Sequence, residues 1–159
     1  MLATSAISIA TLAVAAVAAL SAVGAAAFTY WGNRSMQRDQ WKREARRSVY
    51  TDFLARVSLL VSDAAKYLGT RNKGGAAEDA LGDVATTFEE VMRSYYEVDL
   101  TSPESVRAAA MGVRLKATDL ASHVAEREPI AMVYDAREAL REARRVFVIA
   151  AREDLDAPA

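Results

Sequence analysis

The first 33 residues carry no charged side chain, and this feature constrains the fold more than any other. Within them, residues 7–30 are continuously apolar or small, 24 residues by count. A bilayer core about 30 Å thick is crossed by roughly 20 helical residues. Each strongly apolar side chain of this 24-residue segment favours membrane insertion by about 0.3–0.6 kcal/mol. We therefore expect residues 1–33 to form a transmembrane anchor, with Tyr30 and Trp31 as its interfacial aromatic residues.

A cleaved signal peptide is the alternative interpretation of this segment. Residues 25–27 are all alanine, and small residues of this kind mark a cleavage site. However, no Lys or Arg precedes the apolar stretch, which is also longer than the 7–15 residues of a signal-peptide core. The anchor is the preferred interpretation.

Charge on the two sides of the span predicts its orientation. Residues 34–47 hold six basic side chains against two acidic ones, Asp39 and Glu44, so their net charge is +4. The positive-inside rule places such a cluster in the cytoplasm. We therefore expect a single-pass protein of the plasma (inner) membrane, with its N-terminus outside and its body cytoplasmic. The apolar run of residues 146–151 is too short for a second span.

The basic cluster also predicts a contact with lipid. Near a bilayer surface, each Lys or Arg gains about 1 kcal/mol from anionic headgroups. We expect residues 34–48 to form a basic helical stalk that touches headgroups, although setting the topology alone would also explain the charges. Nucleic acid is not an expected partner, because the cluster lies against the membrane and the chain has a net charge of −1. The predicted headgroup contacts are Arg34, Arg38, Trp41, Lys42, Arg43, Arg46 and Arg47.

Small residues recur along one side of the predicted span. A stripe of this kind lets transmembrane helices approach closely, so a homo-oligomer formed through the span is a further expectation. The stripe consists of Ala15, Ala18, Ala19, Ala22, Ala25 and Ala26.

Four amphipathic helices are predicted after the span, and no strand pattern is present. Apolar residues recur at helical spacing within residues 35–68, 77–98 and 129–152, and in a third helix that lies between Ser102 and the break at Pro129. The first helix should stop at Gly69, Ser102 should cap the third, and Pro103 should be that helix's first residue. The expected core stripes are Phe53, Val57, Leu60, Val61, Ala64 and Leu68; Leu81, Val84, Phe88, Val91, Tyr95 and Val98; Val106, Ala110, Val113, Ala117, Leu120 and Val124; and Val133, Ala136, Leu140, Ala143, Phe147 and Ala150.

Short connections make neighbouring helices antiparallel. The expected fold is therefore all-α: one transmembrane helix followed by an up-and-down antiparallel four-helix bundle over residues 49–152. Residues 153–159 should form a frayed acidic tail.

The stretch from Trp41 to Arg47, followed by Tyr50 and Phe53-Leu54, matches a W-x-R-E-x-R-R-x-x-Y-x-x-F-L pattern. In this it resembles a group of small single-span actinobacterial membrane proteins with a helical C-terminal body. Residues 139–155 are also similar to theirs. The resemblance implies the topology described above and no assigned activity.

Side chains suited to catalysis or metal binding are scarce. The chain has no cysteine and one histidine, His123, with Asp119 and Glu126 on the same helical face. Di-metal bundles need two Glu-x-x-His motifs, so a solvated surface cluster is the preferred interpretation of this group. A Ser-His-Asp triad would have to use this histidine, and no G-x-S-x-G motif occurs.

Two further motifs are also interpreted as structural features without catalytic chemistry. The acidic run of Glu89, Glu90, Glu97 and Asp99 is typical of a solvated helix face, because acid–base work needs a pocket that separates the pKa values. The Lys73-Gly74-Gly75 stretch lacks the phosphate-loop pattern and indicates a connection between helices. We therefore expect no enzyme, no metal and no cofactor.

The sequence as a whole predicts a membrane-anchored, non-catalytic interaction or scaffold protein, with membrane lipid and an unidentified protein as partners. One alternative is a phage- or stress-related regulator of a membrane complex. The other is a secreted helical bundle released by signal cleavage.

Overall fold

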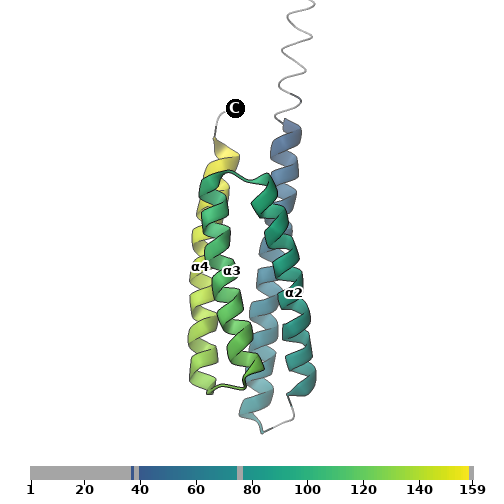
Figure 1. Cartoon of the computed structure of the whole chain (residues 1–159), viewed down its shortest axis with the longest axis vertical. Coiled ribbons are helices and arrows are strands. Elements are labelled where there is room, and N and C mark those ends of the chain that lie inside the picture. Colours follow the sequence, from purple (N-terminus) through teal and green to yellow (C-terminus); the bar gives the residue numbers. More distant parts are fainter. Residues whose placement is uncertain (1–36, 38–39, 75–76, 158–159) are drawn as a thin grey trace, which may run out of the picture. The chain divides into compact units, whose positions relative to one another are not determined.

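The computed structural model describes residues 37, 40–74 and 77–157, which form four helices and no strand (Figure 1). The first helix spans residues 40–72 and is the blue ribbon of the figure. It is followed by α2 (Glu78–Thr101), α3 (Glu104–Ala125) and α4 (Ile130–Asp156). A compact unit begins at Arg43 and contains all of α2, α3 and α4. The prediction of an all-helical four-helix body is confirmed.

Contacts between helices show that neighbours run antiparallel within this unit. Arg56 and Asp63 of the first helix reach Glu90 and Thr87 of α2, so sequence numbers rise on one helix as they fall on the other. The first helix meets α4 in the same sense. Its Tyr50 contacts Asp154, and its Val61 carbonyl accepts a hydrogen bond from Arg137.

The core lies along the inner faces of the four helices. The predicted stripe of α3, from Val106 to Val124, is buried at every position. Where the first helix meets α4, Phe53 and Phe147 pack edge-to-face with ring centroids 5.0 Å apart, and Tyr50 packs on Phe147 at 5.8 Å. Aromatic pairs of this geometry add about 0.5–1.5 kcal/mol beyond the area they bury.

The buried face of α2 agrees with the predicted one at Val84, Val91, Tyr95 and Val98 and differs from it at two positions. Leu81 and Phe88 are only partly buried, whereas Thr87 and Ser94 are buried. The polar contact between Thr87 and Asp63 turns this side of α2 toward the first helix. A prediction based on apolar side chains alone places Leu81 and Phe88 in the core and leaves out Thr87 and Ser94.

The predicted end of the first helix at Gly69 is wrong, because the helix continues to residue 72. Tyr67 and Leu68 are buried just before the glycine, and Arg71 just after it binds the α3–α4 connection. These tertiary contacts outweigh the low helix propensity of a single glycine, which is worth about 1 kcal/mol. The turn comes at Gly74 instead, whose φ of 71° suits glycine.

The start of α3 also differs from the prediction. Only Ser102 and Pro103 separate α2 from α3, and no side chain caps the N-terminus of α3. The Ser102 N–H donates to the Val98 carbonyl oxygen at 3.0 Å, so this residue closes α2. Pro103 immediately precedes the first residue of α3 and is not itself helical.

The expected boundaries at the two ends of the bundle need correction. Helix α4 continues to Asp156, so residues 153–156 are helical and not a frayed tail. The cause is Asp154, which is held by Arg46 and Tyr50 of the first helix. Because the compact unit begins at Arg43, the last residues of the expected stalk belong to the bundle.

The predicted transmembrane anchor, residues 1–33, lies outside the described residues. Among the helices of the described part, none has the length and apolar run needed to cross a bilayer.

Candidate interaction site

The structure describes five of the seven predicted headgroup contacts, and all five lie in the first helix. Trp41 is exposed over 77% of its surface, and Lys42 and Arg47 are exposed as well. Arg43 and Arg46 are half-buried. The other predicted membrane residues lie outside the described part of the chain: Arg34, Arg38, Tyr30, Trp31 and the alanine stripe at 15, 18, 19, 22, 25 and 26.

Arg46 has a structural partner within the bundle. Its guanidinium lies 3.0 Å from the Asp154 carboxylate, which also accepts a 2.8 Å hydrogen bond from the Tyr50 hydroxyl. Burial, with the hydrogen bond to Asp154 acting in the same direction, raises the pKa of Tyr50 to about 12. This triad joins the beginning of the first helix to the end of α4.

A second polar group is buried between the first helix and α2. Asp63 is only 7% exposed and accepts hydrogen bonds from the Thr87 hydroxyl at 2.7 Å and from the Lys66 ammonium at 2.8 Å. Burial acts to raise the pKa of Asp63, but the hydrogen bonds from Lys66 and Thr87 outweigh it and hold the pKa below its ordinary value. A buried carboxylate with two donors is satisfied, and here it joins two helices.

The α3–α4 connection forms a third polar cluster. Arg127 lies in the left-handed region with φ of 54°, which costs a non-glycine residue about 1–2 kcal/mol. Its carbonyl oxygen accepts a 2.8 Å hydrogen bond from Arg71, which also donates to the Glu128 carbonyl oxygen. The Arg127 guanidinium lies 2.6 Å from the Glu78 carboxylate. These contacts tie the connection to the first helix and to α2.

The histidine cluster differs from its predicted composition. His123 Nδ1 lies 2.7 Å from the Glu128 carboxylate, while Asp119 pairs with Lys116. Glu126 is exposed. Among the described residues, no group of three or more acidic or imidazole side chains is arranged to hold a metal ion.

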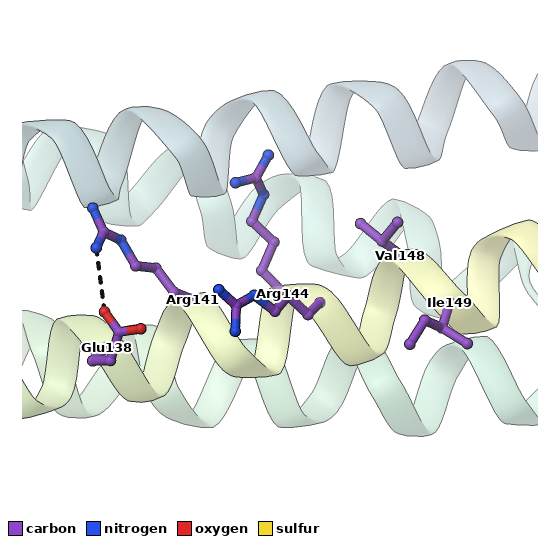
Figure 2. Close-up of a pocket in the computed structure, with 6 residues that line it drawn as sticks. Glu138, Arg141, Arg144, Val148 and Ile149 are labelled. Atoms are coloured by element: carbon purple, nitrogen blue, oxygen red, sulfur yellow. Dashed lines mark hydrogen bonds and ion pairs between the residues drawn. The ribbon is translucent and has the colours of Figure 1, made fainter.

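A hollow on the bundle surface runs along α4. It has a volume of about 630 Å³ and is lined by four charged side chains and two aliphatic ones. In Figure 2, Arg144 points from α4 toward the first helix, Arg141 meets Glu138, and Val148 and Ile149 follow along the same helix. The lining residues are Glu138, Arg141, Arg144, Arg145, Val148 and Ile149.

Helix α2 is strongly acidic. It holds seven acidic side chains and one arginine, Arg93. Of the acidic run singled out in the sequence, Glu90 forms an ion pair with Arg56, whereas Glu89 and Glu97 are exposed and have no ion pair among the described residues. Two exposed apolar side chains share this outer face: Tyr96 at 56% and Leu100 at 85%. The outer face of α2 therefore presents acidic and apolar side chains, with the exposed Arg93 between Glu89 and Tyr96.

Sequence reasoning missed Asp63, Asp154 and the arginines of α4. Asp63 follows the buried Leu60 by three residues, so an acidic residue at a core position was a usable signal. Asp154 gave no such signal, because its partners lie 104 and 108 residues away in the sequence.

Comparison with known protein families, with curated proteins and with solved structures gave no match to this chain.

Proposed function

We propose that this protein is a single-pass membrane protein whose four-helix body is a non-catalytic interaction module on the cytoplasmic side. The observation that carries the proposal is the 24-residue apolar segment followed at once by a cluster of net charge +4. The resemblance to small single-span actinobacterial proteins supports the same topology. The exposed charged and apolar faces of α2 and α4 give the module surfaces for a partner.

Two measurements on the full chain test the anchor and its orientation. Alkaline carbonate should leave the protein in the membrane pellet, because an inserted helix resists it and a surface-bound protein does not. The chain has no cysteine, so single cysteines can report the two sides. A cysteine at Ser5 should react with an impermeant maleimide on intact cells, and one at the exposed Ser105 only after lysis.

The opposite labelling pattern would place the bundle outside. A soluble protein lacking its first residues would identify the secreted alternative. As a matched control, Val17→Arg should cost about 2.5–3.5 kcal/mol of insertion and release protein into the carbonate supernatant.

We further propose that the basic residues before the bundle contact anionic headgroups. Replacement of Arg34, Arg38, Lys42 and Arg43 by Gln should reduce the quenching of Trp41 by headgroup-labelled anionic lipid in reconstituted vesicles. The helical signal should be unchanged, because Lys42 and Arg43 have no ion pair among the described residues, and Arg34 and Arg38 precede the compact unit that begins at Arg43. Arg46→Gln is the contrasting variant, since it removes the partner of Asp154 and should lower the melting temperature. Equal quenching in neutral and anionic vesicles would contradict the headgroup contact.

A further inference from the structure

Arg144 differs from the other two arginines that line the hollow along α4, here called the α4 hollow. Arg141 and Arg145 each form an ion pair with a glutamate of their own helix. Arg144 is half-buried and has no ion pair or hydrogen bond among the described residues, and its Nε is buried without an acceptor. Buried donors in native proteins nearly always have an acceptor, so an unpartnered one needs an explanation.

Two contacts fix which part of the first helix lies beside Arg144. Seven residues before it, Arg137 Nε donates to the Val61 carbonyl oxygen at 3.2 Å. Three residues after it, Phe147 packs on Phe53. Because the two helices run antiparallel, Arg144 is level with the segment between residues 53 and 61 of the first helix. The Arg144 side chain points toward that helix (Figure 2).

This part of the first helix supplies no counter-charge to Arg144. Between residues 45 and 65 it has two acidic residues, Asp52 and Asp63. Asp52 lies 3.5 Å from Arg56, which itself reaches α2, and Asp63 accepts a hydrogen bond from Thr87 of α2. Both carboxylates are therefore engaged on the side of α2, and the Arg144 charge is left for an anion from outside the chain.

Apolar side chains continue the α4 hollow beyond Arg144. Val148 and Ile149 lie about one turn further along α4 and line the same hollow, and Ile149 is 57% exposed. The volume of about 630 Å³ falls within the range of small-molecule sites, about 300–1,000 Å³. A half-buried guanidinium beside two aliphatic side chains suits a ligand with an anionic group at one end and an apolar group next to it.

We propose that the α4 hollow binds a small water-soluble organic anion, in which a carboxylate or phosphate group is attached to an apolar group. The planar fork of Arg144 holds two oxygens of the anion, and the apolar group covers Val148 and Ile149. The ion pairs of Arg141 and Arg145 stay in place, so one anionic group on the ligand is enough. The site lies within the bundle, and the inference does not depend on the proposed anchor.

Calorimetric titration of the full chain in nanodiscs of neutral lipid tests the site, with empty nanodiscs as the background. The probes are phenyl phosphate and benzoate, compared with inorganic phosphate and phenol. At least one of the first two should bind about tenfold more tightly than both inorganic phosphate and phenol, because only they engage Arg144 and the aliphatic pair together. If neither does so, the proposal is overturned.

Substitutions then locate the bound probe. Arg144→Gln should weaken its binding about tenfold, which corresponds to about 1.4 kcal/mol. Arg93→Gln makes the same change at an exposed position of α2 and is the matched control, which should bind like the wild type. Ile149→Ser should weaken binding of the phenyl probe severalfold and leave that of inorganic phosphate unchanged. Unchanged affinity in Arg144→Gln, or an equal loss in Arg93→Gln, would overturn the proposal.

Thermal melting separates a binding role of Arg144 from a structural one. Because the Arg144 Nε has no acceptor, Arg144→Gln should not lower the melting temperature of the ligand-free protein. The probe should raise the melting temperature of the wild type but not that of the variant. If Arg144→Gln loses helical signal, Arg144→Lys, which keeps the charge and removes the fork, replaces it with the same expected loss of binding. A lower melting temperature with unchanged probe affinity would make Arg144 a structural residue and overturn the proposal.

Discussion

At the scale of single residues, polar groups hold this bundle together at points where an apolar pattern predicts only hydrophobic packing. Asp63 accepts two hydrogen bonds at a position that is 7% exposed. Asp63→Leu should cost about 1–3 kcal/mol in the free energy of unfolding, because the buried Thr87 hydroxyl loses its acceptor. Adding Thr87→Val should recover most of this loss, since neither side then has an unmet polar group. Urea unfolding at neutral pH measures both effects.

The contribution of Asp63 has a defined pH dependence. Its pKa is lowered in the folded protein, so its stabilisation is complete above the unfolded value near 3.8 and is lost as pH falls through the folded value. The gap between the wild-type chain and Asp63→Leu should therefore narrow in acid. Asp135→Leu, at an exposed position of α4, is the control and should change the free energy of unfolding by less than about 0.5 kcal/mol. A constant gap down to the lowest pH would contradict this account.

Tyr50 gives the converse dependence at alkaline pH. Its pKa rises from 10.0 to about 12 on folding, so the stabilisation it contributes is present below pH 10 and is lost as pH rises toward 12. Tyr50→Phe should be less stable than wild type below pH 10 and should lose less stability between pH 10 and 12. Thermal melts across this range, with Tyr134→Phe as the exposed control, measure the difference. Parallel curves for the wild type and Tyr50→Phe would show that the hydroxyl is not coupled to folding.

At the scale of helices, the last turn of α4 is stabilised by the contacts of Asp154 with the first helix. Asp154→Ala removes the acceptor of both Arg46 and Tyr50 and should cost about 1–3 kcal/mol. Asp156→Ala, two residues later and exposed, should change the free energy of unfolding by less than about 0.5 kcal/mol. Chemical denaturation of the two variants makes the comparison. Equal losses would mean that charge at the helix end, and not the contact with the first helix, is responsible.

The same scale shows what the sequence can and cannot predict. Helical spacing located the α3 stripe completely, because that face is buried by apolar residues alone. It located four of the six core residues of α2 but missed the buried Thr87 and Ser94, and it ended the first helix too early at Gly69. In both cases the deciding contact comes from another helix. The polar clusters between helices were less predictable still, since the partners of Asp154 lie 104 and 108 residues away in the sequence.

At the scale of the whole molecule, the core residues that join the first helix to α4 should control global stability. Phe147→Ala should cost about 3–5 kcal/mol, because its ring is fully buried against Phe53 and Tyr50. Phe88→Ala should cost less, since Phe88 is only partly buried. A domain of this size has about 5–15 kcal/mol in total, so thermal melts should separate the two variants clearly. Equal melting temperatures would contradict this assignment of the core.

The contact between Arg46 and Asp154 also determines how the bundle responds to mechanical force. It places the first and last helical turns of the compact unit beside each other, on helices that run antiparallel. A pull applied between these two ends would peel the first helix from α4 one turn at a time, beginning at the Arg46–Tyr50–Asp154 triad. Peeling breaks contacts in sequence and not all at once, so the bundle would yield to small forces applied at its ends while resisting heat and denaturant as a single unit.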